Sequence, residues 1–273
     1  MAGYTAADVK RLREETDAPM MECKNALEEA DGDYERAKEI LREKGKAAAG
    51  KKAGRATTAG VVAFAASADN KTVAGVLVES ETDFVSKNEG FVAMAQEIAD
   101  YVLANGAPEG NPMDDPKFKE FAENIVAKFR ENVQIPRAFR LTSENPIATY
   151  IHHDKTKGTA VVSEGENAGS EAVRKVAVQA AAFPPEVVSK DQLPQDKLDA
   201  EIELETKRAI DEGKDEKIAR NIAQGRVNKE YIKKVVLLEQ PFYIDPSKSV
   251  SQYLAEEAKG AKINSFVYLG VGV

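Results

Sequence analysis

The sequence contains the same order of predicted elements twice, and this repeat constrains the fold more than any other feature. The first copy has an apolar stretch, a turn, a second apolar stretch and a helical pattern at residues 61–65, 69–70, 73–79 and after Val85. The second copy has the same series at residues 147–152, 154–155, 158–163 and 171–182. Short apolar stretches separated by Asp and Asn turns predict antiparallel hairpins, and a following helix can cover one face of each. We therefore expect an α+β fold with two repeated β-β-α core subdomains.

Helical patterns flank and interrupt these repeats. Near the start, Thr5 with Asp8 opens a first helix, Pro19 suits the beginning of a second, Asp33 caps a third, and Gly45 is expected to end it. Three short helices of this kind resemble a ubiquitin-associated module. Residues 46–59, rich in Ala, Gly and Lys, are typical of a linker or a loosely held helix.

A second helical part lies late in the chain. Residues 197–231 are strongly charged and helix-forming, with an interruption at Gly213 and only a thin apolar stripe on each side of it. This pattern predicts a protruding helical hairpin. We expect strands at 235–239, 242–244 and 263–269, and a short helix after Ser249. The predicted domains are a three-helix module (1–54), a first core subdomain (55–140), a second one (141–183 and 233–273) and the inserted hairpin (184–232).

Composition limits the class of function. The net charge of the 273 residues is −8, which argues against general nucleic-acid binding, because phosphate affinity comes from Lys and Arg. A basic stretch at 42–55 is the exception; it could contact RNA, but the favoured interpretation is a solvated helix end running into a linker, where the helix dipole stabilises cations. Cys23 is the single cysteine, which excludes an internal disulfide and favours a reducing, cytoplasmic location. We expect neither a membrane span nor a secretory signal.

Patterns that would indicate catalysis or a cofactor are weak. The segment 45–51 has most of a phosphate-binding loop, but no Ser or Thr follows Lys51 and a helix, not a strand, precedes it. His152 and His153 are the only histidines, and neighbours on a regular strand point to opposite faces, so we expect no metal site. No nucleophile pattern stands out. We therefore expect no catalytic residue, no cofactor and no covalent chemistry.

The segment Thr82-Asp83-Phe84-Val85-Ser86-Lys87-Asn88 joins the second strand of the first repeat to its helix. Ser86 with Glu89 three residues later is typical of a capping box, which predicts that the helix begins just past Val85. Asp83 and Phe84 are then left in a short connection. Phe84 could fold back into the core, or both side chains could project toward a partner.

This segment resembles the signature of the elongation factor Ts family of bacterial translation factors. Further motifs that resemble the family follow in order along the chain, at 12–41, 225–226, 237–242 and 245–250. The resemblance implies a guanine nucleotide exchange factor, with the loop driven into the GTPase elongation factor Tu so that GDP leaves. It implies partner contacts by Thr82, Asp83, Phe84 and Val85, which loosen the magnesium ion of the partner, and by Arg13, Met20, Met21 and His152.

Two of these implied contacts have alternatives. One of the two methionines could pack in the core, and His152 could be a half-exposed strand residue. The sequence also departs from the family pattern at three places. Asp17-Ala18-Pro19 stands where Gly-Ala-Gly is usual, and Arg130 stands where the family often has Gly. A C-terminal helix of some members has no counterpart before Val273, which implies weaker partner binding.

Other functions are open to test. The three-helix module alone could bind a ubiquitin-like protein, or the basic stretch and the hairpin could bind RNA or the ribosome. The hairpin could also pair two copies of the chain. Neither of the first two alternatives accounts for the Thr-Asp-Phe-Val segment.

Overall fold

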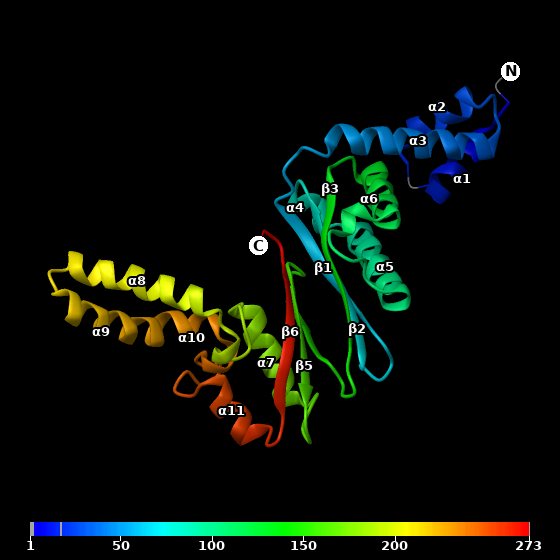
Figure 1. The fold of residues 1–273 in the computed structure, drawn as a ribbon. Helices are drawn as coiled ribbons and strands as arrows, with labels where there is room; N and C mark the ends of the chain where they lie inside the picture. The colour runs from blue at the N-terminus through cyan, green and yellow to red at the C-terminus, as the bar shows by residue number, and fades with distance from the viewer. Residues whose placement is uncertain (1–2, 17, 273) are drawn as a thin grey trace.

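A computed structural model describes residues 3–16 and 18–272, and it has an α+β fold with two three-stranded antiparallel sheets (Figure 1). A three-helix module lies on one side of the sheets and a long helical hairpin projects from the other side. Each part follows from the local sequence, but several predicted elements and ends differ from the structure.

The N-terminal module consists of α1 (Ala6–Thr16), α2 (Met20–Glu29) and α3 (Tyr34–Lys52). The Asp33 carboxylate caps α3 by accepting a hydrogen bond from the Arg36 N–H at 3.0 Å. A small closed core holds the three helices together, with its fully buried members at Leu12, Cys23, Ala26, Leu27 and Ala37. Its likeness to a ubiquitin-associated module stays a prediction, and Asp17 of the expected turn lies outside the described residues.

The third helix does not end at Gly45, contrary to the sequence prediction. It continues to Lys52 and packs along helix α6 of the core. A Cβ atom at Gly45 would stand 3.2 Å from the Cβ atom of Ala127, so this glycine permits two helices to approach closely. Residues 46–52 of the segment expected to be a linker or a loosely held helix are therefore helical and pack on the core.

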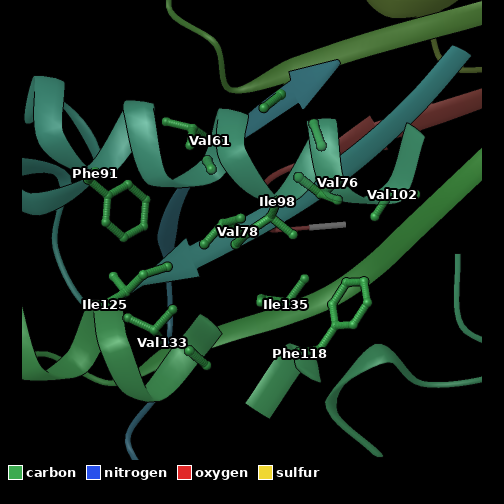
Figure 2. Close-up of a cluster of buried hydrophobic side chains, with 14 of the residues drawn as sticks. Val61, Val76, Val78, Phe91, Ile98, Val102, Phe118, Ile125, Val133 and Ile135 are labelled. Carbon is green, nitrogen blue, oxygen red and sulfur yellow. The ribbon is translucent and has the colours of Figure 1, made fainter. Parts of the chain in front are cut away.

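The first sheet has the order β1-β2-β3, with β1 (Ala59–Ala66), β2 (Thr72–Ser80) and β3 (Val133–Thr142). A one-turn helix α4 (Asp83–Ser86), helix α5 (Glu89–Asn105), the 3₁₀ turn η1 (Pro112–Asp114) and helix α6 (Pro116–Phe129) lie between β2 and β3. Figure 2 shows the apolar side chains of the sheet meeting those of α5 and α6. Strand β3 was not predicted, because Pro136 and Arg137 interrupt its apolar pattern. Pro136 is tolerated because β3 is an edge strand, where a missing N–H breaks no ladder, and Arg137 is exposed to solvent.

The second sheet repeats this topology with β4 (Ala148–Ile151), β5 (Lys157–Glu164) and β6 (Lys262–Gly270). Helix α7 (Glu171–Ala182) covers one face, and α11 (Val250–Glu257) packs beside it. In both halves, helices separate the second strand from the last strand in the sequence, and these two strands pair. The predicted repeat is thus present, extended by one strand in each half.

The two sheets pack face to face and share one apolar interior. Phe64 and Phe139 contact both clusters of this interface, and their rings lie 5.4 Å apart in an edge-to-face arrangement. Gly75 leaves room for them, because a Cβ atom there would stand 2.5 Å from Phe139 and 2.6 Å from Phe64. The other buried members of the interface are Val62, Leu77, Leu269, Val73, Ile147 and Ala160.

The inserted hairpin consists of α8 (Gln195–Asp211) and α9 (Glu216–Arg226), which continues as a π-helical turn η3 (Val227–Tyr231) into α10 (Ile232–Val235). Gly213 has φ +85° at the tip, a conformation that favours glycine. The small side chains of Ala209, Ala219 and Ala223 are fully buried between the two helices. The predicted hairpin is therefore present.

The segment after the hairpin differs from its prediction. Residues 235–239 and 242–244 were expected to be strands, but α10 is followed by the 3₁₀ turn η4 (Leu237–Glu239), and the chain forms only isolated bridges. One bridge joins Val236 to Val187, near a further 3₁₀ turn η2 (Lys190–Gln192). Residues 235–237 are all buried, and such a short apolar stretch has no period with which to separate strand from helix.

Candidate partner-binding surface

The Thr82–Asn88 segment forms the one-turn helix α4, and its caps differ from the predicted ones. The Thr82 hydroxyl, 3.5 Å from the Val85 N–H, caps α4. The Asn88 side chain accepts from the Gly90 N–H at 2.9 Å and caps α5. The prediction that Ser86 caps the long helix is wrong. Ser86 is buried, and its hydroxyl donates to the Asp83 carbonyl at 3.3 Å.

The corner between α6 and β3 holds this turn in place. Glu131 accepts two hydrogen bonds from Thr82, one from its N–H at 2.9 Å and one from its hydroxyl at 2.6 Å. The Asn132 N–H donates to Glu81 at 2.6 Å, which lowers the pKa of the Glu81 carboxyl. The turn is therefore fixed at its base by charge-assisted bonds.

Phe84 projects from this fixed base. Its side chain is 86% exposed, whereas its neighbour Val85 is half-buried and packs against the core of the first sheet. Asp83 is exposed and pairs with Lys87 at 2.6 Å, and this ammonium lowers the pKa of the Asp83 carboxyl. An aromatic ring and a carboxylate thus stand side by side on a rigid, solvent-facing turn. The alternative in which Phe84 folds into the core does not hold.

The implied contacts of the N-terminal module are also on the surface. Arg13 is exposed in the last turn of α1, and Met20 and Met21 are 47% and 61% exposed in the first turn of α2. Neither methionine fills the core of the module. Such adjacent, flexible thioethers suit an adaptable interface.

His152 follows the last residue of β4 and is half-buried. Its Nδ1 atom lies 2.9 Å from the Tyr150 hydroxyl, and its ring centroid lies 4.3 Å from that of His153. The same turn reaches the first sheet, because the Val62 N–H donates to the Lys155 carbonyl at 2.7 Å. Val62 lies in the first half of β1, and Ala59 at the start of this strand pairs with Ser80 just before α4, so the His152 turn lies toward the α4 end of the paired sheets.

The comparisons with known proteins agree along the chain. A family model described as Elongation factor TS matches residues 81–273. The chain is 40% identical to an Elongation factor Ts of Photorhabdus laumondii over 272 residues, which cover 100% of this chain and 93% of that protein. It is likewise 40% identical to one of Thiobacillus denitrificans over 278 residues, covering 100% and 93% of the two chains. One of Nocardia farcinica is 39% identical over 289 residues, covering 100% and 99%.

The chain belongs to the elongation factor Ts family. Members of this family are translation elongation factors that act in nucleotide exchange. The predicted family is thereby confirmed, and the matched region includes the α4 turn, the α6–β3 corner and the His152 turn.

Three residues of this surface in the elongation factor Ts chain were not identified as site residues from the sequence. Glu81, Glu131 and Asn132 form the base of the α4 turn; Glu131 and Asn132 match a Gly-Glu-Asn pattern of the family apart from Arg130, but no role was assigned to them from the sequence. A carboxylate directly after a helix end is common and is usually solvated, so the sequence alone does not indicate a role for Glu131.

Among residues 3–16 and 18–272 there is no group of three or more His, Cys, Asp or Glu side chains that could hold a metal ion. Over the same residues, no helix combines the length and apolar character needed to cross a bilayer.

Proposed function

We propose that this chain is a guanine nucleotide exchange factor that binds elongation factor Tu in its GDP form and promotes GDP release. The observation that carries the proposal is the α4 turn, where Phe84 is 86% exposed on a base fixed by Glu131. Folding leaves this apolar ring in water, and burying it in a partner would remove that area from water and so favour binding. Because the base is already rigid, little conformational entropy is lost on binding.

The turn would act on the magnesium ion of the partner. Magnesium requires near-ideal octahedral geometry, so a small displacement of its ligands weakens its binding and exposes the repulsion between phosphates. Phe84 would enter beside the nucleotide pocket, while the carboxylate of Asp83 contacts polar groups there, with Thr82 and Val85 supporting both. No covalent step and no cofactor of this chain are needed.

Remote contacts would supply the binding energy. Arg13, Met20 and Met21 would anchor one part of the partner, and His152 would contact another. Exchange requires that the chain bind nucleotide-free elongation factor Tu more tightly than the GDP form, and the coupling is reciprocal. This action places the protein in the cytoplasm with the translation machinery.

The basic stretch supports protein binding over nucleic-acid binding. Three of its cations have partners within the chain. Lys44 pairs with Glu29 at 2.5 Å, Arg55 lies 3.5 Å from Glu81, and Lys52 donates to the Arg130 carbonyl. RNA would have to displace these contacts. Pairing of two copies through the hairpin stays a separate prediction for this chain.

Release of a fluorescent GDP from elongation factor Tu tests the proposal. We expect the full chain to accelerate release at substoichiometric concentration, and excess GDP to compete with the chain for elongation factor Tu. A Phe84→Ala variant, compared at equal concentration, should lose most of the acceleration. If the wild-type chain binds the partner but leaves the release rate unchanged, the protein is not an exchange factor.

A further inference from the structure

Three consecutive residues at the α6–β3 corner hold the two proposed contact surfaces in place. Arg130 forms an ion pair with Glu22 of the N-terminal module, and its carbonyl accepts a hydrogen bond from Lys52 at the end of α3. The next residue, Glu131, holds the α4 turn through Thr82. The third, Asn132, donates from its backbone to Glu81.

The ion pair lies across a cleft beside the contact between α3 and α6. A cleft of about 480 Å³ lies between the module and the core, and Glu22 and Arg130 both line it. Glu22 follows Met20 and Met21 directly in the first turn of α2. The side chains of Arg130 and Glu22 are 32% and 35% exposed, so solvent screens the pair only in part.

The backbone of Arg130 points to a role for its side chain. Arg130 ends α6 with φ +61° and ψ +22°, a left-handed conformation in which a residue with a Cβ atom is strained. Glycine would occupy it without that strain. The backbone conformation therefore does not explain why an arginine stands here, whereas the contact of its guanidinium with Glu22 does.

We propose that Arg130 is a positioning residue that locks the orientation of the N-terminal module relative to the α4 turn, and so presets the spacing between Met20–Met21 and Phe84. The proposal rests on the exchange function given above. With the pair broken, α1, α2 and α3 stay packed together and α3 still contacts α6, but the module as a whole can turn about this contact. The partner must then order the module on binding, which weakens binding without changing the step that Phe84 performs.

The decisive variant is Arg130→Gly, because it removes the side chain and suits the backbone conformation. Spin labels at two exposed sites, introduced by Lys24→Cys in α2 and Glu97→Cys in α5 with Cys23→Ala in the same chain, report the distance between module and core. We expect a narrow distance distribution with Arg130 present and a broader one in Arg130→Gly. Reversing both charges, Glu22→Arg with Arg130→Glu, should restore the narrow distribution.

Exchange kinetics provide the second measurement. Arg130→Gly should raise KM for the GDP form of elongation factor Tu by about two- to fivefold, the range of a partly exposed ion pair, with kcat unchanged. Glu131→Gln, which disturbs the base of the α4 turn, should lower kcat instead. Equal distance distributions with and without the Arg130 side chain would overturn the proposal, even if the chain proves not to be an exchange factor. A raised KM that the charge reversal fails to restore would instead make Arg130 a direct partner contact.

Discussion

At the scale of single residues, adjacent residues of the α4 turn have different roles. A helix of one turn has too few hydrogen bonds to be stable alone, so its conformation depends on Thr82, Glu131 and the half-buried Val85. Phe84 contributes nothing to this packing, since its ring faces water. A side chain that does not contribute to the packing of the fold is available for contact with a partner.

The first prediction compares Phe84→Ala with Val85→Ala. Phe84→Ala should leave the free energy of unfolding within about 0.5 kcal/mol of wild type, as is usual for exposed positions, while GDP release slows strongly. Loss of an aromatic anchor commonly weakens binding by ~2 kcal/mol or more. Val85→Ala should lower the free energy of unfolding by about 1 kcal/mol, because part of its buried side chain leaves the core. Urea denaturation and fluorescent GDP release measure the two quantities.

The pair serves as its own control, because the two positions are adjacent. If Phe84→Ala destabilises the chain while the folded fraction exchanges GDP normally, the ring is structural. Asp83→Ala should behave like Phe84→Ala in exchange, because its pairing with Lys87 is exposed and adds little stability.

At the scale of the elements, strict periodicity decided what could be predicted from sequence. Helix α7 has the predicted bounds, 171–182, because a regular apolar face ends at Phe183-Pro184. The caps around α4 could not be assigned, since Ser86 and Asn88 both lie within two residues of a helix end and both fit a cap. The identity of Asp83 and Phe84 as candidate contacts came from the family resemblance, while their fixation by Glu131 required the folded structure.

The second prediction concerns the hairpin. Its base packs into a small cluster with Leu193 and Val236 through Leu198 and Tyr231, so only the part beyond this base is independent of the core. Replacing residues 202–229 with a short flexible linker should leave one cooperative thermal transition, because the removed part buries mainly alanines against itself. Circular dichroism would follow the transition, and GDP release would show whether the arm also contributes to exchange. Loss of the cooperative transition would mean that the arm supports the core.

At the scale of the whole molecule, the repeat does not produce two independent domains. Each sheet has one face covered by its own helices and uses its other face to cover the other sheet. The predicted boundary between 140 and 141 falls inside β3, so the division into two core subdomains stays a prediction, and we expect the two sheets to share their stability through the common apolar interface. The N-terminal module is different, because its buried residues contact one another within α1, α2 and α3.

The third prediction follows from this contrast. Phe64→Ala removes a ring that contacts both sheets, and it should reduce amide hydrogen-exchange protection in β2 and β5 by the same free energy, about 2–3 kcal/mol. Leu27→Ala removes a fully buried side chain of the module, and it should reduce protection in α1–α3 while leaving the sheets within about 0.5 kcal/mol of wild type. Hydrogen exchange with mass spectrometry resolves these segments in one experiment. If Phe64→Ala lowers protection in the first sheet alone, the halves unfold separately. The α4 turn and the His152 turn would then belong to sheets that unfold separately. One shared core would not set the distance between these two proposed contacts.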